Sequence, residues 1–202
     1  AGFEALLARP GPWIGGFDFP FGLPAEAVGD LGWPRRWPAL VTHCRTLGRS
    51  GFRAALDRYR ESRPLGNRYA HRATDAPARS HSPLKLVNPP VGLMFLEGAP
   101  RLLDAGVSIP GLARGDPKRI ALEAYPGLAA RALVSESYKS DDKAKQTPER
   151  LIARKTLINA LENGLAPLLQ SVGLRLKLSH AQRDALVDDA SGDSLDAVLC
   201  LL

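Results

Sequence analysis

Two short segments of the chain have the hydrophobic pattern of buried strands. The first, WIGGF at residues 13–17, is apolar at both alternating sets of positions, which predicts a strand buried on both faces. Asp18 ends it, and the following FPFGLP neither continues a strand nor easily starts a helix. The second, RIALEAYPG, alternates apolar residues until Pro126 breaks the run, and Glu123 stands near its carboxyl end. Each predicted strand therefore carries an acid where it ends.

Helical spacing and capping residues account for most of the remaining chain. Gly48 is expected to stop one helix and Ser50 to begin the next. Thr147 with Pro148 marks another helix start, and Ser179 with Gln182 forms a predicted capping box. The predicted helices cover residues 2–8, 38–47, 50–61, 91–105, 127–133 and 148–163; residues 65–90 are a predicted long irregular loop, and residues 173–179 a predicted short edge strand.

The last predicted helix, SGDSLDAVLCLL, has two acids beside its apolar face. Its apolar residues recur at helical spacing from Leu195 to Leu202. Asp193 and Asp196 are three positions apart and lie side by side on another face. The plainer interpretation makes Asp193 the N-cap and Asp196 the acid at the third helical position of a capping box. That interpretation suits Asp193 better than Asp196, because apolar neighbours surround Asp196 and a buried carboxylate needs a partner.

Composition sets the class of protein. With 202 residues and 45% hydrophobic content, the chain can bury a core, and one domain with insertions is expected. No run of eighteen apolar residues occurs, so no membrane span is predicted. Cys44 and Cys200 lie far apart, as is typical of reduced core cysteines, which predicts a cytoplasmic location. The chain starts without methionine and stops inside an apolar helix, which predicts a fragment of a longer protein.

The net charge of +6 is unevenly distributed. Residues 35–85 contain twelve Lys and Arg against three acids, 12 − 3 = +9, and residues 131–155 contain seven against four, 7 − 4 = +3. Residues 179–202 have one arginine against five aspartates, 1 − 5 = −4. Basic surface around an acidic focus is typical of proteins that hold a polyanion and cut it at bound cations. On charge alone, simple solvation of surface helices is the favoured interpretation.

Three separate elements deliver acids that one site could use. In open α/β sheets, ligands bind at the carboxyl ends of the strands. Several carboxylates remain ionised side by side only when cations compensate them, and oxygen ligands favour magnesium or manganese. The sequence therefore predicts catalytic and metal-binding roles for Asp18, Glu123, Asp193 and Asp196.

Four motifs in order, GGFDFPFGLP, ALEAYPGLAARAL, SYKSD and GDSLDAVLCLL, resemble the domain-of-unknown-function family 429 over nearly the whole chain. Those proteins are predicted nucleases with a ribonuclease H-like fold. The resemblance implies a single α/β domain over residues 1–202: three α/β/α layers, a mixed central sheet and a large, basic helical insertion at about 25–105. Three antiparallel strands would come first, followed by two parallel strands that end at Asp18 and Glu123. The first strand normally supplies the principal aspartate, and no such strand precedes Gly2 in this sequence. Either the opening strands lie upstream, or the site is incomplete and the protein is not a nuclease; the abrupt start of the sequence agrees with the first alternative.

The activity implied by the resemblance is hydrolysis of nucleic-acid phosphodiesters by two magnesium or manganese ions. One ion would activate water and the other would stabilise the leaving oxygen, at a separation of roughly 3.5–4 Å. Backbone phosphates would be held without reading of sequence. For each basic residue taken singly, a solvated loop is the favoured alternative. The residues expected to hold phosphates are Lys139, Lys143, Lys145, Arg150 and Arg154.

Two other functions stay open. One is a catalytically inactive nucleic-acid-binding or protein-binding module of the same fold, and the other is an actin-like small-molecule phosphotransferase. The sequence has no G-x-S-x-G, P-loop or G-x-G-x-x-G motif. Its four histidines lack metal-ligand spacing with either cysteine, which argues against a zinc site.

Overall fold

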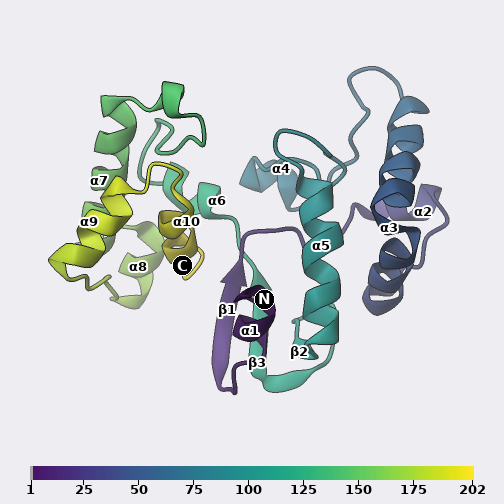
Figure 1. The fold of residues 1–202 in the computed structure, drawn as a ribbon, viewed down its shortest axis with the longest axis horizontal. Helices are drawn as coiled ribbons and strands as arrows, with labels where there is room; N and C mark the ends of the chain where they lie inside the picture. Colours follow the sequence, from purple (N-terminus) through teal and green to yellow (C-terminus); the bar gives the residue numbers. More distant parts are fainter. Residues whose placement is uncertain (1) are drawn as a thin grey trace. The chain divides into compact units, whose positions relative to one another are not determined.

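The computed structural model describes residues 2–202, apart from the side chain of Lys143. It is of the mixed α/β class, with many helices and one small sheet (Figure 1). The chain divides into two compact units, residues 1–124 and residues 125–202, called unit 1 and unit 2 below. None of the helices in the described residues combines the length and hydropathy needed to span a bilayer.

Unit 1 contains a three-stranded parallel sheet. Strands β1 (Trp13–Phe17), β2 (Val107–Ser108) and β3 (Asp116–Glu123) lie in the order β1-β3-β2. The two strands predicted to end at acids, at residues 13–17 and before Pro126, are confirmed, and β1 pairs with β3 from Trp13 opposite Arg119 to Phe17 opposite Glu123. The antiparallel strands that would make the sheet mixed are not among the strands of the described residues.

The prediction that β1 is buried on both faces is wrong. Phe17 and Ala121 belong to the core, and the Phe3 ring of helix α1 (Gly2–Leu7) meets the Phe17 ring edge-on, with ring centroids 5.7 Å apart. On the opposite face Ile14 is 66% exposed, and Leu122 is exposed too. Within unit 1 the described helices cover only one face of the strands. An apolar run with two glycines does not reveal which face is covered.

Four helices connect β1 to β3, since parallel strands require a long crossover. They are α2 (Ala25–Asp30), α3 (Trp37–Glu61), α4 (Asp75–Ala78) and α5 (Val91–Asp104). Helix α3 is broken where the sequence predicts a stop, at Gly48, with φ 64° and ψ 177°. Glycine adopts this conformation without the strain that a Cβ brings. The helix predicted over residues 91–105 is confirmed by α5.

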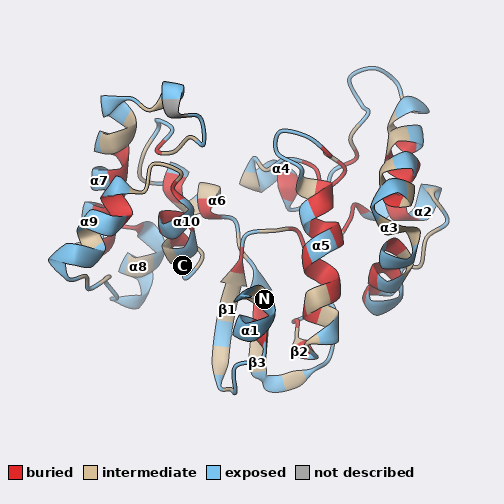
Figure 2. Cartoon of the chain, viewed as in Figure 1, coloured by how far each residue is buried: buried red, intermediate tan, exposed pale blue. Residues whose placement is uncertain are grey.

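The core of unit 1 lies mainly between α3 and α5. Val41, Phe52 and Leu56 of α3 are buried together with Phe95 and Leu102 of α5 (Figure 2). Most of the segment at residues 65–90 is irregular, as predicted, apart from α4. Its buried residues include Leu84 and Leu86, so this long segment packs against the same core.

Unit 2 is helical. Its core is formed by Leu157, Ile158 and Leu161 with Leu195 and Leu199. The predicted capping box is confirmed, because Ser179 Oγ accepts from Gln182 N at 3.3 Å and Gln182 Oε1 accepts from Ser179 N at 2.9 Å. The elements are α6 (Pro126–Arg131), the 3-10 turn Lys143–Lys145, α7 (Pro148–Glu162), α8 (Pro167–Val172), α9 (His180–Asp188) and α10 (Asp193–Leu199).

The strand predicted at residues 173–179 is wrong. This segment pairs with no strand in the described residues, and its Leu176 N–H donates to Leu161 O at 2.9 Å instead. Leu176 and Leu178 pack on the helical core, while Arg175 and Lys177 are exposed. An extended segment lying on helices satisfies the same alternating pattern as an edge strand.

Candidate functional site

Two of the predicted site residues lie at the same edge of the unit 1 sheet. Glu123 ends β3 opposite Phe17, and Asp18 follows Phe17 directly. Ala124 N–H donates to Phe17 O at 3.0 Å, so the parallel pairing extends to the strand ends. Phe19 N–H donates to the same oxygen at 2.9 Å, which turns the chain tightly at the exposed Asp18. This pairing brings the backbones of Asp18 and Glu123 close together.

Glu123 is engaged by groups of unit 1. Its Oε1 lies 2.8 Å from Arg72 Nη1, and its Oε2 accepts the Phe21 N–H at 2.8 Å. Arg72 also bonds Asp75, which is 0% exposed, through Nη2 at 2.8 Å and through its backbone N–H at 2.7 Å. Burial by itself lowers the pKa of Arg72, but the hydrogen bonds that its guanidinium donates to Asp75 and the negative charge of Glu123 outweigh that effect and raise the pKa. The arginine is therefore a fixed cation beside Glu123.

The other two predicted site residues open α10 in unit 2. Its N-cap is Gly192, with φ 77°, so the interpretation of Asp193 as N-cap is wrong. The side chain of Asp189, three positions before Gly192, supplies the acceptor for the helix start instead. It accepts hydrogen bonds from Ser194 N at 2.8 Å and from Gly192 N at 3.2 Å. A hydrogen bond from the Ser191 hydroxyl, with these backbone bonds, holds the pKa of Asp189 well below its usual range.

Asp196 is the buried acid of α10. It is 6% exposed and accepts hydrogen bonds from the Tyr138 hydroxyl and from Lys139 Nζ. Lys139 Nζ also lies 5.8 Å from the centre of the Tyr138 ring. The partner that a buried carboxylate requires is thus supplied by the SYKSD motif.

The predicted phosphate-binding residues have different environments. Arg154 is 4% exposed, and it donates from Nε to Val187 O at 2.7 Å and from Nη1 to Tyr138 O at 2.8 Å. Arg150 donates to Lys139 O, and Lys145 pairs with Asp142 at 3.4 Å on the surface. The side chain of Lys143 lies outside the described residues. Arg154 of α7 is therefore an internal hydrogen-bond donor that connects Val187 and Tyr138 of unit 2, and in this environment it does not face solvent.

The four acids do not assemble a metal centre within either unit. Among the described residues, no three or more His, Cys, Asp or Glu side chains are grouped closely enough to hold an ion. Glu123 and Asp196 direct their oxygens to Arg72 and Lys139 instead. The donor sets within the units therefore do not fit magnesium or manganese as they stand. Convergence of Asp18 and Glu123 with the α10 acids remains a prediction.

The sequence did not predict the contacts that three residues make around the predicted acids. Arg72, Asp75 and Asp189 form the polar networks around the predicted acids. The D-A-S-G-D-S spacing is a recognisable signal for Asp189, since an aspartate before Ser-Gly commonly bonds nearby backbone N–H groups. No local signal pairs Arg72 with Glu123, because Arg72 lies in the irregular segment 51 residues before it.

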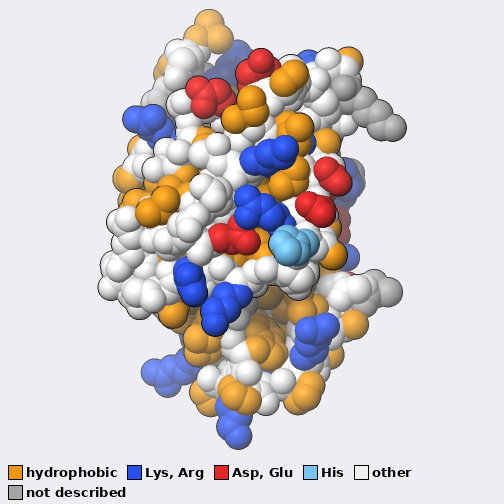
Figure 3. Space-filling model, turned by 90° about the vertical axis from the view of Figure 1, so that its left-hand side faces the viewer, with side chains coloured by type: hydrophobic (Ala, Val, Ile, Leu, Met, Phe, Trp, Pro, Cys, Tyr) orange, Lys and Arg blue, Asp and Glu red, His pale blue; other side chains and the backbone are white. Residues whose placement is uncertain are grey.

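Basic side chains do not form one continuous band on the face drawn in Figure 3, where blue and red groups are interspersed. Comparison of the chain with protein-family models, with curated proteins and with solved structures finds no match. The likeness to family 429 and the ribonuclease H-like fold therefore stay predictions.

Proposed function

We propose that this chain is a nucleic-acid-processing domain of the ribonuclease H-like fold, with metal-dependent phosphodiester hydrolysis as its activity. One observation carries the proposal: β1 and β3 are adjacent parallel strands, with Phe17 opposite Glu123. Asp18 therefore follows β1 and Glu123 ends the neighbouring β3, both at the carboxyl ends of the strands, where open α/β sheets bind ligands. The chain order of strand, helices, strand and C-terminal helix with two acids agrees with the same fold.

The charge distribution supports a polyanionic substrate. Unit 1 contains 17 Lys and Arg side chains and 11 acids, 17 − 11 = +6. Unit 2 contains 10 of each, 10 − 10 = 0. The whole net charge of the chain thus belongs to unit 1, which also holds Asp18 and Glu123. Binding of a nucleic-acid backbone by this charge would weaken steeply with salt through counterion release.

Magnesium or manganese is part of this proposal as the ion that oxygen ligands favour. Arg72 and Lys139 occupy the carboxylates that would bind such an ion, so no reaction step is assigned to it. For hydrolysis to occur, these basic groups would have to release Glu123 and Asp196.

Cleavage assays on the full chain test the proposal. Single-stranded and double-stranded DNA and RNA are incubated with magnesium, with manganese and with a chelator. We expect cleavage in the presence of metal, and its loss in the double variant Asp18→Asn/Glu123→Gln. Glu61→Gln is the matched control, because Glu61 is an exposed acid of unit 1 outside the ion pairs of the described residues. Cleavage that survives the double variant would contradict the roles of Asp18 and Glu123.

A second candidate is a nucleic-acid-binding module without activity. The ion pairs of Glu123 with Arg72 and of Asp196 with Lys139 favour it, since both acids already have a protein cation. In that case the full chain binds nucleic acid in a salt-dependent way, cleaves none, and binds equally well with and without divalent cations.

A further inference from the structure

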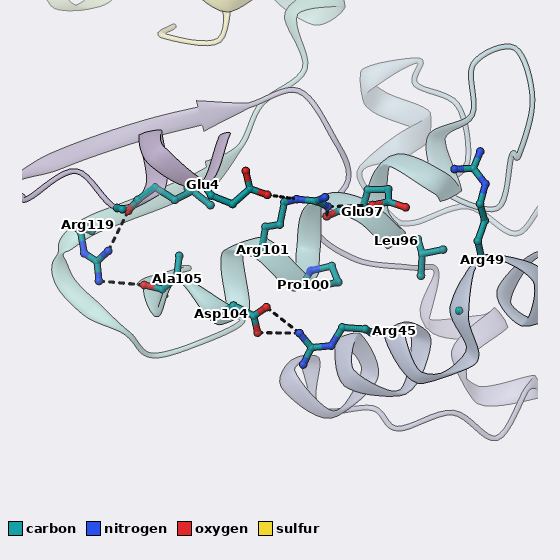
Figure 4. A pocket seen from close by; sticks show the side chains of 13 residues that line it. Glu4, Arg45, Arg49, Leu96, Glu97, Pro100, Arg101, Asp104, Ala105 and Arg119 are labelled. Atoms are coloured by element: carbon teal, nitrogen blue, oxygen red, sulfur yellow. Dashed lines mark hydrogen bonds and ion pairs between the residues drawn. The ribbon is translucent and has the colours of Figure 1, made fainter. Parts of the chain in front are cut away.

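Most charged side chains around a cavity of about 640 Å³ in unit 1 are paired with one another (Figure 4). Arg45 Nη1 lies 2.9 Å from both carboxylate oxygens of Asp104, and Arg101 Nε lies 2.7 Å from Glu4 Oε1. Side chains that are already paired have little charge left for a ligand. The surface around helix α8 of unit 2 is different, because exposed apolar side chains and unpaired basic groups lie together there.

Four aliphatic side chains are exposed within ten residues around α8. The exposed fractions are 53% for Leu165, 54% for Leu168, 62% for Val172 and 62% for Leu174. Leu168 and Val172 are four positions apart on the helix, so they lie on one face of it. The helix has no buried residue, and its Leu169 packs against the core of unit 2. Apart from that contact, α8 presents its side chains to solvent.

Backbone contacts close this segment into a compact turn. Gly173 ends α8 with φ 65°, and Leu174 N–H donates to Leu169 O at 3.0 Å. A Cβ built on Gly164 would lie 2.9 Å from Leu174 O, so the two ends of the segment are in contact. The backbone positions of Leu165 and Leu174 are therefore close together at the base of α8. The four exposed side chains are called the α8 patch below.

The charge beside the α8 patch is positive. Arg175 and Lys177 directly follow the patch, are exposed, and have no hydrogen bond or ion pair among the described residues. The Cβ of Arg175 would lie 3.6 Å from a Cβ built on Gly164, which places Arg175 at the base of the same turn. Residues 163–183 contain no Asp or Glu. An apolar surface with a basic border suits a partner that is anionic outside and apolar inside.

We propose that the α8 patch enters the headgroup layer of an anionic lipid bilayer, with Arg175 and Lys177 against the lipid phosphates. A lipid surface takes up an exposed apolar turn without a shaped pocket, and binding grows with the buried apolar area and the basic charge. The segment would lie on the bilayer surface, which requires no spanning helix. The inference does not rest on the proposed hydrolysis, because it uses none of the residues predicted for that activity.

A second copy of the chain is a poorer occupant of the α8 patch. The exposed apolar area is on the order of a few hundred Å², whereas a stable protein interface buries roughly 800 Å² on each partner. Two copies joined through this patch would also bring the basic side chains of both copies together, with no acid in residues 163–183 to compensate them. Area and charge therefore both favour the anionic lipid surface.

Sedimentation of the full chain with lipid vesicles tests the proposal. One set of vesicles is phosphatidylcholine alone, and the other contains phosphatidylglycerol as well. We expect binding to the anionic vesicles and roughly tenfold weaker binding to the neutral ones, since basic residues near an anionic surface add to the affinity. The double variant Leu168→Gln/Val172→Gln keeps the net charge and should bind anionic vesicles roughly tenfold more weakly than the wild type.

The matched control is Leu128→Gln/Ile152→Gln. These two residues are as exposed as those of the patch, at 53% and 61%, but lie on α6 and in the first half of α7. The control should bind both kinds of vesicle as the wild type does. Since all four exchanged side chains are exposed, the melting temperatures of both double variants should match the wild type, which separates a loss of binding from a loss of folding.

A third variant tests the basic border. Arg175→Gln/Lys177→Gln should weaken binding to anionic vesicles roughly tenfold and leave binding to neutral vesicles unchanged. Equal binding of anionic vesicles by Leu168→Gln/Val172→Gln and the wild type would mean that the net charge alone attracts the chain, and would overturn the proposal. Absence of binding to both kinds of vesicle would overturn it too. In that case, self-association that Leu168→Gln/Val172→Gln abolishes would assign the α8 patch to a second copy. Failure of the cleavage assays would leave the proposal standing.

Discussion

The carboxylate of Glu123 and the guanidinium of Arg72 form an ion pair 2.8 Å long across 51 residues of sequence. The same guanidinium bonds Asp75, which is fully buried. One side chain from the long irregular segment thus links the end of β3 to α4, the short helix within that segment. The relationship fixes the surroundings of the predicted site and makes Arg72 a test of them.

Arg72→Gln is expected to destabilise the protein by about 3 kcal/mol, because it leaves the buried carboxylate of Asp75 without its cation. Urea unfolding of the two proteins measures the difference. Arg79→Gln is the control, since Arg79 lies in the same segment without an ion pair among the described residues. A loss of less than about 0.5 kcal/mol, which is within the error of the measurement, would contradict the role of Arg72.

Arg154→Met is expected to destabilise the protein by about 2–4 kcal/mol, since the Val187 and Tyr138 carbonyl oxygens lose charged donors in a buried place. The exposed Lys155→Met should change stability by roughly 0.5 kcal/mol or less. Thermal unfolding measures both. If Arg154→Met instead unfolds like the wild type and loses nucleic-acid binding, the residue acts on substrate as the sequence predicts.

Asp196→Asn tests the acid of α10. Because Asp196 pairs with Lys139 and bonds Tyr138, the substitution should lower stability without metal by about 1–3 kcal/mol. Relief of repulsion in an acidic cluster would raise it instead. Melting curves with and without magnesium or manganese, on both proteins, measure the two effects. A metal-dependent shift that is identical in both proteins would end the proposal that Asp196 binds metal.

Asp189 gives a dependence on pH. Its pKa is lowered in the folded protein, so its contribution is present above the unfolded value near 3.9 and is lost as the pH falls towards the folded value. Asp189→Asn should be less stable at pH 7 by about 1 kcal/mol, because the backbone N–H groups of Gly192 and Ser194 at the start of α10 lose their charged acceptor. The wild-type and variant stabilities should converge as the pH falls below about 4. The exposed Asp188→Asn is the control, and a gap that persists at low pH would contradict this account.

The two cysteines should differ in reactivity. Burial raises the pKa of the Cys44 thiol to about 12, so almost no thiolate is present near neutral pH. Cys200 is only partly buried. Labelling of the folded protein with a thiol reagent should therefore modify Cys200 first, and Cys44 only as fast as the protein opens. Equal rates for the two thiols would contradict the buried position of Cys44 on α3.

Features encoded by neighbouring residues could be predicted from the sequence. Gly48 breaks a helix, and Ser179 with Gln182 caps one, because each effect acts within a single turn. The two strands at residues 13–17 and before Pro126 were predictable from local runs of apolar residues, and so was the position of the acids at their ends. Local pattern also predicts the apolar face of α10, since Leu195 and Leu199 are buried.

Features that depend on distant residues could not be predicted in this way. Leu176 packs on a helix rather than in a sheet, and Ile14 faces solvent because no described helix of unit 1 covers it. The ion pair of Glu123 and the burial of Arg154 depend on the fold of the whole unit. Counting charged residues along the sequence treats Arg154 as part of the basic surface, although its side chain is a buried hydrogen-bond donor.

The division of charge between the units has a consequence for how each would behave in water by itself. A protein near zero net charge lacks the repulsion that keeps its copies dispersed. Unit 2 has ten basic and ten acidic side chains, and it exposes Leu165, Leu168 and Val172 around α8. If a protease separated the two units, unit 2 would be the fragment that aggregates at neutral pH. The cationic unit 1 would remain in solution and bind to a cation exchanger. In the intact chain, unit 1 supplies the colloidal stability of both.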